Sequence, residues 1–379
     1  MKSMRKSPRV GPGNGILRVY IISLLTLAAA AFVQHAPALQ AAQAPSAGQT
    51  NGTSAPAAPG AGRTITLDVQ VTDKSGTPIR GLHQEDFTLL DDNQPEPITS
   101  FQAVDRAAPA PTDPPVEVEL IIDAVNAGFL TVSYERDQIK KFLLHEGGEL
   151  PQPVSLIGFT DSGAKALGPP SRDGNALMSE FEDYETGLRT VTRSQGFYGA
   201  TERFSASLNA LAALTALQAS RPGRKLMIWI SPGWPLFSGP NVGVSSQEEQ
   251  KLFNLIVKEF AEFDQAGVTV YTIDPLGGSD IATNQLYKDY LKGVKSPSSA
   301  QPGNAGLQVF SVQSGGRVLT PINDIAGAID QCAADAAAYY ILTFNALPAD
   351  RANEYHSLQI KVDKPGSVAR TRTEYYAQP

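Results

Sequence analysis

The chain has 379 residues, of which 42% are hydrophobic and 18% are charged. This composition excludes a wholly disordered polyelectrolyte and a membrane protein with many spans, and the length predicts about two globular domains with a sizeable core. With 31 Lys and Arg against 38 Asp and Glu, the net charge is −7. The chain therefore lacks the basic excess that binding to nucleic acid or to an anionic membrane surface requires.

The first residues have the pattern of a targeting segment. Residues 1–18 carry five basic side chains and no acidic one, and residues 19–33 form an apolar run followed by Ala36-Pro37-Ala38, which has cleavage-site spacing. This pattern predicts a signal peptide over residues 1–38, and hence an exported protein without a membrane span after cleavage. A retained membrane anchor is the alternative. Cleavage would remove five of the 31 basic residues and none of the 38 acidic ones, so the net charge would become −12.

Residues 39–63 are mainly Ala, Pro, Gly, Ser, Thr and Gln. Such a stretch cannot bury enough apolar surface to offset its ordering entropy, so it predicts a disordered linker. Cys332 is the only cysteine, which excludes an internal disulfide. It shares a helical apolar stripe with Ile325, Ile329 and Ala336, which favours a core position over the alternative of a catalytic thiol.

After the linker, the pattern predicts a small all-β unit over residues 64–106. Residues 64–72 alternate with period two and end at a turn over residues 73–76. Two further strands, residues 86–90 and 98–101, flank a turn at Asp91-Asp92-Asn93. Pro95 and Pro97 confine this hairpin to a sheet edge.

From residue 116 to residue 338 the pattern changes to alternating strands and helices. Buried strands with intervening helices predict a mostly parallel, doubly wound sheet with helices on both faces. The expected strands are residues 116–123, 154–159, 225–231 and 268–274, with an antiparallel partner at 165–167; the expected helices are residues 133–145, capped by Ser133, 201–217, a helix between the Ser245–Glu248 capping box and Gly267, and 323–338.

The C-terminal residues 339–377 return to an all-β pattern, with strands expected at 339–344, 355–362 and 369–376. Neither β unit is large enough to form a core alone. We therefore predict that residues 64–106 and 339–377 pair into one β-sandwich. The α/β domain is then either inserted in this sandwich or flanked by it.

Several of these segments resemble a known family. Leu120-Ile-Ile-Asp123, Lys225-Leu-Met-Ile-Trp-Ile-Ser231 and Val268-Thr-Val-Tyr-Thr-Ile-Asp274 are similar to the strands of a von Willebrand factor A-type domain. More narrowly, Val71-Thr72-Asp73 and Ser314-Gly-Gly-Arg317 resemble the exported acidobacterial VWFA-related proteins. The resemblance extends from residue 64 to residue 376 and implies a Rossmann-like sheet.

This family implies a metal-ion-dependent adhesion site, built from an Asp-x-Ser-x-Ser turn, a loop Thr and a second Asp. Asp123 matches the first Asp and Thr201 the loop Thr. Val125 and Ala127 stand at the two hydroxyl positions, and Pro232 stands where the second Asp belongs. The resemblance therefore implies a degenerate site without a resident cofactor, and weak Mg²⁺ or Ca²⁺ binding is the alternative.

Other residues at the same edge of the sheet are candidates for ligand binding. Asn126, Asp161 and Asp274 offer oxygens there, but Asp123 and Asp274 can equally accept backbone N–H bonds, Asn126 can be a turn residue and Thr201 a helix cap. Trp234 and Phe237 are candidate anchors for a protein ligand if exposed, and otherwise pack on the sheet.

The sequence favours a non-catalytic, exported protein that binds an unidentified protein ligand through residues 124–130, 196–203 and 231–243. His-Glu-x-x-His, Gly-x-Ser-x-Gly and Walker motifs are absent from the sequence, so an enzyme is not expected. A cation-dependent adhesin is one alternative. A hydrolase is another, and it would require acids such as Asp161 and Glu182 to converge.

Overall fold

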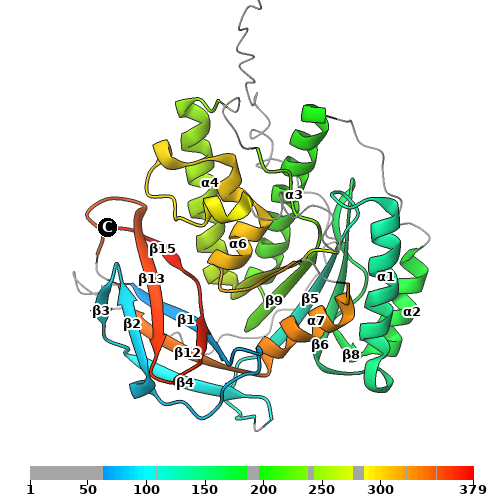
Figure 1. Cartoon of the computed structure of the whole chain (residues 1–379), viewed down its shortest axis with the longest axis horizontal. Helices are drawn as coiled ribbons and strands as arrows, with labels where there is room; N and C mark the ends of the chain where they lie inside the picture. Colours follow the sequence, from blue (N-terminus) through cyan, green and yellow to red (C-terminus); the bar gives the residue numbers. More distant parts are fainter. Residues whose placement is uncertain are drawn as a thin grey trace, which may run out of the picture.

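The computed structural model describes residues 63–107, 109–185, 196–237, 243–275, 286–320, 323–346 and 348–379. The predicted signal peptide and almost all of the predicted linker lie outside these ranges. The described chain combines a mostly parallel, helix-covered sheet with two antiparallel sheets (Figure 1). Within these ranges, no helix is both long and apolar enough to cross a membrane.

The parallel sheet forms the centre of the α/β part. Its strand order is β11-β10-β9-β5-β6-β7, with β8 also paired to β6, and only β7 and β8 run antiparallel to their neighbour. The first strand of this sheet, β5, lies in its middle. Strands β6 to β8 are added on one side of β5 and strands β9 to β11 on the other, so the direction in which strands are added reverses between β5 and β9. The strands are β5 (Val116–Asp123), β6 (Glu149–Thr160), β7 (Gly163–Ala166), β8 (Ser171–Asp173), β9 (Arg224–Ile230), β10 (Val268–Ile273) and β11 (Val318–Leu319).

Helices cover both faces of this sheet because its buried strands carry apolar side chains on both faces. Val118, Leu120 and Ile122 of β5 join a core with α1, α2 and α7, while Ile121 faces a second core with α3, α4 and α6. The helices are α1 (Phe129–Leu144), α2 (Gly174–Glu185), α3 (Gly196–Ala219), α4 (Ser246–Ala266), α6 (Leu307–Gln313) and α7 (Ile325–Ala333), which the short helix η6 (Ala334–Ala336) extends.

The capping residues expected from the sequence bound α4 but not α1. The Ser245–Glu248 capping box begins α4, and Gly267 ends it with φ +62°, as predicted. The prediction that Ser133 caps this helix is wrong, because α1 begins at Phe129 and its N-cap is Gly128. Gly128 makes no side-chain cap, which is why the sequence pattern did not reveal this start.

The two antiparallel sheets pack face to face around a third core. One has the order β14-β1-β12-β4 and the other β15-β13-β2-β3, so strands from both ends of the described chain pair directly. Inward side chains such as Leu67, Leu89 and Phe344 fill the space between them. The strands are β1 (Thr64–Thr72), β2 (Phe87–Asp91), β3 (Gln94–Glu96), β4 (Ser100–Asp105), β12 (Ala338–Asn345), β13 (Glu354–Val362), β14 (Val368–Arg370) and β15 (Glu374–Ala377).

A fully buried aspartate joins the sandwich to the α/β part. Asp335 in η6 accepts hydrogen bonds from Arg317 (2.9 Å), Arg370 of β14 (2.7 Å) and the Tyr271 hydroxyl (3.0 Å). Its backbone carbonyl accepts a further bond from Arg224 at 2.9 Å. The carboxylate therefore forms ion pairs with two guanidinium groups and fixes β10, β14 and the turn before β12 relative to one another.

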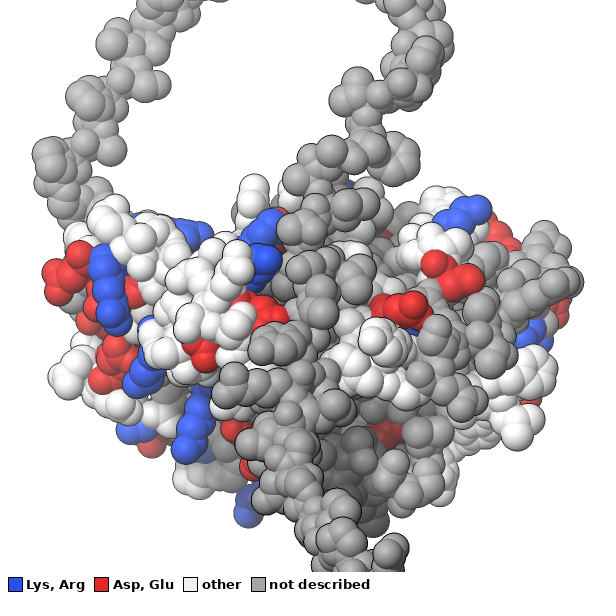
Figure 2. Space-filling view, turned by 90° about the horizontal axis from the view of Figure 1, so that it is seen from above, with Lys and Arg blue, Asp and Glu red and all other residues white. Residues whose placement is uncertain are grey.

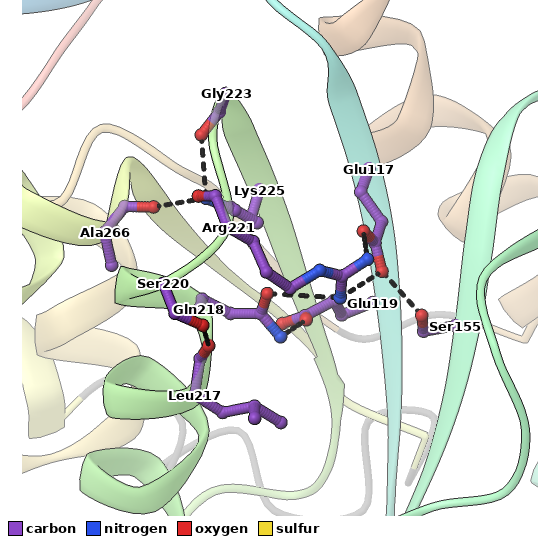
Figure 3. A network of polar contacts seen from close by, with 10 residues as sticks. All are labelled: Glu117, Glu119, Ser155, Leu217, Gln218, Ser220, Arg221, Gly223, Lys225 and Ala266. Atoms are coloured by element: carbon purple, nitrogen blue, oxygen red, sulfur yellow. Dashed lines mark hydrogen bonds and ion pairs between the residues drawn. The ribbon is translucent and has the colours of Figure 1, made fainter. Parts of the chain in front are cut away.

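A polar network lies around the start of β5, whereas Asp123 ends this strand. Figure 3 shows the residues of the network. Glu117 forms an ion pair with Arg221 and accepts a bond from the Ser155 hydroxyl at 2.6 Å. Lys225, which is 2% exposed, donates to the carbonyls of Gly223 and Ala266 at 2.9 Å each. Burial lowers the pKa of Lys225. The lysine thus provides a hydrogen-bond donor for the Gly223 carbonyl, which follows α3, and for the Ala266 carbonyl at the end of α4.

Glu119 lies two residues further along β5, fully buried, with Gln218 as its hydrogen-bond donor. Its second carboxyl oxygen has no hydrogen-bond partner. Burial, reinforced by the charge of Glu117, raises the pKa of Glu119 from its usual range to about 8. The group is therefore largely protonated in the folded chain at neutral pH, whereas it is ionised in the unfolded chain.

This shift predicts that stability falls as the pH rises. A raised carboxyl pKa means that the folded state binds more protons, so the stabilisation is complete below the unfolded pKa and is lost as the pH rises through about 8. Glu119→Gln should reduce the decrease in unfolding free energy between about pH 5 and about pH 9 by on the order of 3 kcal/mol. Urea denaturation across this range measures the effect, with the exposed Glu202→Gln as control. A Glu119→Gln profile as steep as that of the wild type would refute the expectation.

Candidate functional site

The carboxyl ends of β5, β6, β9 and β10 meet at one edge of the parallel sheet, because these strands are parallel and in register. Asp123 ends β5, while Ser231 and Asp274 directly follow β9 and β10. This edge includes the reversal in strand order between β5 and β9, where adjacent loops diverge and open α/β sheets commonly bind ligands. The predicted site residues belong to this edge or to the helices that start near it.

Asp123 is fully buried and accepts five hydrogen bonds from the chain itself. Its Oδ1 accepts the backbone N–H groups of Val125 (3.0 Å) and Asn126 (2.8 Å). Its Oδ2 accepts the Asn126 side-chain amide (2.8 Å), the Trp229 indole N–H (3.0 Å) and the Ser231 hydroxyl (2.8 Å). Burial raises the pKa of Asp123, and the bonds from Asn126, Ser231 and Trp229 oppose that rise. Both carboxylate oxygens are thus already occupied by protein donors.

Val125 and Ala127, which stand at the hydroxyl positions of the pattern that the sequence resemblance implies, serve as core contacts. Val125 packs in the core beneath α3 and α4, whereas Ala127 packs in the core beneath α1 and α7. Each is 8% exposed. The turn after Asp123 is therefore held by apolar packing on both sides and by hydrogen bonds to the carboxylate, and neither Val125 nor Ala127 offers an oxygen ligand from its side chain.

Asn126 connects this turn to α3. Its amide nitrogen donates to the Ser207 hydroxyl at 2.9 Å as well as to Asp123. Thr201 lies six residues earlier on α3, about 9 Å along the helix axis. Its hydroxyl donates to the Phe197 carbonyl at 3.0 Å, so the prediction that Thr201 caps the helix is wrong. Ser207, rather than Thr201, is the α3 residue that reaches the Asp123 turn.

Glu135 is a site feature that the sequence pattern misplaced. The helix expected at residues 133–145 would place it in the first turn, where an acidic side chain is favoured, but α1 starts at Phe129 and Glu135 is fully buried. Neither of its carboxyl oxygens has a hydrogen-bond partner. Burial, reinforced by the negative charges of Asp123 and Asp274, raises the pKa of Glu135 well above its usual value. Its burial therefore favours the neutral form of this carboxyl group beside the edge.

Asp274 is also fully buried, and its backbone N–H donates to the Leu319 carbonyl at 3.0 Å. Asp161, by contrast, is exposed in the turn between β6 and β7. Among the described residues, the one group that brings three possible metal ligands within 4.8 Å of one another is Asp91, Asp92 and His356 in the sandwich. Asp123, Glu135 and Asp274 therefore do not form a compact ligand set.

The two aromatic candidates have different environments. Trp234 is 3% exposed and packs edge-on against Trp229, with the ring centroids 5.3 Å apart. It is thus a core residue and not an exposed anchor. Phe237 is half-buried, and its ring contacts those of Phe197 and Phe204 at centroid distances of 5.5 Å. Residues 238–242 of the predicted binding loop lie outside the described ranges.

Large apolar side chains are exposed at the first turns of α1 and α3. Leu130 and Tyr198 are the most exposed, at 81% and 80%, followed by Phe129 at 61%. Tyr134 and Phe197 are partly exposed. We call these five residues the edge residues. They lie within or next to the predicted loops 124–130 and 196–203, and covering their apolar surface with a partner protein would be favourable.

A cavity of about 240 Å³ lies elsewhere, between the sandwich and the α/β part. Charged side chains line it, but Asp68 pairs with Arg224 at 3.2 Å and Asp264 pairs with Arg372 at 2.6 Å. These groups already neutralise one another across the interface. The cavity is therefore better explained by the joining of the two parts than by ligand binding.

No family model and no curated protein matches the sequence. Solved structures resemble parts of it weakly. They include the PilB minor pilin from Streptococcus sanguinis (12% identity, 61% of this chain, TM-score 0.33), the human COPII-coat protein Sec24c (8%, 70%, 0.31) and the open form of the pilus adhesin SpaC from Lactobacillus rhamnosus GG (10%, 81%, 0.35). The chain covers 64%, 44% and 48% of these structures, respectively. At such TM-scores the likeness carries no information on function.

Proposed function

We propose that this chain is an exported, non-catalytic protein-binding module with a von Willebrand A-like α/β domain, residues 116–338, inserted between two halves of a β-sandwich. The order β7-β6-β5-β9-β10-β11 supports a doubly wound, Rossmann-like sheet: when the short β8 is left out, numbering from β5 gives the order 3-2-1-4-5-6, with β7 antiparallel. The N-terminal basic and apolar pattern supports export. The assignment to the von Willebrand A family comes from the sequence resemblance of strands β5, β9 and β10.

The observation that carries this proposal is the environment of Asp123. In a working adhesion site the corresponding carboxylate would face a cation, but here five protein donors surround it. The ion cradle is thus replaced by an internal hydrogen-bond network that holds the turn before α1. Recognition would then depend on contact with the edge residues, without a cation.

The surface charge is consistent with a protein partner. On the face drawn in Figure 2, basic and acidic side chains are interspersed over the described residues. Such a mixed pattern does not follow a phosphate backbone, which needs a continuous basic track. Aromatic side chains such as Phe129, Phe197 and Tyr198 are instead enriched at the centre of protein–protein interfaces.

Glu135 gives one reason to keep the cation-dependent adhesin as a second candidate. Its carboxyl group is buried, has no hydrogen-bond partner and lies close enough to Asp123 and Asp274 to sense their charges. A divalent cation there would have to ionise Glu135 and displace the donors of Asp123. A hydrolase finds less support, since Asp161 and Glu182 are exposed on different elements.

Charge insertion at the edge tests the proposal. Leu130→Glu and Tyr198→Glu should each weaken capture of partner protein from native cell-envelope extract by tenfold or more, because a carboxylate would be desolvated in an apolar interface. Thermal unfolding should stay unchanged, since both side chains are exposed. Quantitative pull-down followed by titration of the captured protein measures the effect.

Leu217→Glu provides a matched control. Leu217 is 55% exposed and lies near the opposite end of α3 from Tyr198, so the same substitution on the same helix should leave capture intact. Capture retained by both Leu130→Glu and Tyr198→Glu would contradict the proposal. Equal loss in Leu217→Glu would show a general effect of added charge.

A further inference from the structure

A second cluster of chemically active side chains lies in the sandwich, far in sequence from the α/β edge. Asp91 ends β2, Asp92 begins the turn to β3, and His356 lies on the neighbouring strand β13. His356 Nδ1 is 3.0 Å from Asp91 Oδ1 and 3.8 Å from Asp92 Oδ2. One ligand atom from each residue lies within 4.8 Å of the other two.

Residues outside this cluster fix each of its members in place. The Tyr375 hydroxyl donates to Asp91 Oδ2 at 2.5 Å. The backbone N–H and the hydroxyl of Ser357 donate to Asp92 Oδ1 at 3.0 and 2.9 Å. The His356 ring stacks on Tyr375 with centroids 4.8 Å apart. One oxygen of each carboxylate is therefore held by a supporting donor, and the other faces the imidazole, which is the usual arrangement around metal ligands.

The two nitrogen-to-oxygen distances in this cluster are close to those around a small divalent cation, and all three ligand atoms lie within 4.8 Å of one another. Ligands at about 2.0–2.2 Å from Zn²⁺ in a tetrahedron lie roughly 3.3–3.6 Å from one another, and the two observed distances, 3.0 and 3.8 Å, lie on either side of this range. Without a cation, one Nδ1–H can serve only one of two carboxylates. A divalent ion would bind both carboxylates and the neutral imidazole together.

The mixed ligand set also indicates which cation. A nitrogen ligand with two carboxylates suits Zn²⁺ and related transition metals, whereas Mg²⁺ and Ca²⁺ prefer oxygen ligands throughout. The Asp92 side chain is 53% exposed, so water can reach the cluster and complete the coordination. The His356 side chain, at 17% exposed, and the Asp91 side chain, at 9%, provide the enclosed part.

We propose that Asp91, Asp92 and His356 form a Zn²⁺-type site with water in the remaining coordination position. The ion joins the β2–β3 turn to β13, two segments separated by 265 residues in sequence. This site is independent of the Asp123 edge and of the protein-binding function proposed for it. Its effect is to stabilise the sandwich in the presence of the metal.

Calorimetric titration of the untagged, chelator-treated chain with Zn²⁺ tests the proposal. Saturable binding of one Zn²⁺ per chain is expected, together with a visible absorption band of four-coordinate Co²⁺. His356→Gln and Asp92→Asn should each weaken Zn²⁺ binding by tenfold or more and remove the Co²⁺ band. Asp92→Asn keeps the test informative if His356→Gln unfolds the sandwich, because the Asp92 side chain is largely exposed.

His83→Gln is the matched control, since His83 is an exposed histidine of the same sandwich and is not part of the cluster. It should bind Zn²⁺ as the wild type does. Absence of saturable binding in the wild type would overturn the proposal. So would unchanged affinity in both His356→Gln and Asp92→Asn, which would leave an ordinary imidazole–carboxylate pair.

Discussion

Replacing Asp335 with alanine should lower the free energy of unfolding by about 3–5 kcal/mol, the range seen when one partner of a buried ion pair is removed. Asp335 is fully buried and receives Arg317, Arg370 and the Tyr271 hydroxyl. Its loss would leave two guanidinium groups partly buried without a counter-charge. Because these groups come from the α/β part and from β14, we expect the two parts to lose their joint cooperativity as well.

Urea denaturation followed by both tryptophan fluorescence and far-ultraviolet circular dichroism measures this effect. Trp229 and Trp234 lie in the α/β core, whereas circular dichroism also reports the sandwich. Asp137→Ala on the exposed face of α1 is the control and should change stability by less than about 0.5 kcal/mol. A similarly small change in Asp335→Ala would show that the buried cluster is not what holds the two parts together.

Asp123→Ala should lower the free energy of unfolding by about 2–4 kcal/mol, since it leaves several buried donors without an acceptor. The Trp229 indole, the Ser231 hydroxyl and the Asn126 amide all lose the same partner. The loss should be equal with and without Mg²⁺, because the stabilisation comes from protein donors. Asp123→Asn should cost less, as one amide oxygen remains an acceptor.

The same denaturation measurement in EDTA and in excess Mg²⁺ tests this expectation, with the exposed Asp161→Ala as control. A Mg²⁺-dependent difference between wild type and Asp123→Ala would mean that the carboxylate holds a cation in solution. A neutral effect in both buffers would mean that the turn is held by the packing of Val125 and Ala127 alone.

The mixed α/β architecture could be predicted because local patterns encode it. The alternation in β1, the apolar runs of β5, β9 and β10, and the capping box before α4 are all contained within short segments. Pairing between distant strands could be inferred only from the small size of each β unit. The strand expected at residues 369–376 is in fact two, β14 and β15, which pair with different sheets. Nothing local to this segment shows that its two ends have different partners.

The candidate site was predicted only in part, for a similar reason. The position of Asp123 could be predicted because it ends a buried strand. Its donors Trp229 and Ser231, however, lie in β9 and directly after it, more than 100 residues later in the chain. The burial of Glu135 was missed because an acidic side chain is normally solvent-exposed, although its spacing of four residues from Ile139 puts it on the buried face of α1. The cluster at His356 was missed altogether, since its ligands are brought together by the pairing of β2 with β13.

The central claim is that protein donors have replaced a cation at Asp123. Thermal unfolding of the wild-type chain, titrated with Mg²⁺ and with Ca²⁺, tests it most directly, with His356→Gln alongside so that the sandwich cluster is excluded as the source of any shift. We predict that the melting temperature stays constant in both titrations. A saturable rise in the wild type and in His356→Gln that Asp123→Asn abolishes would contradict the account.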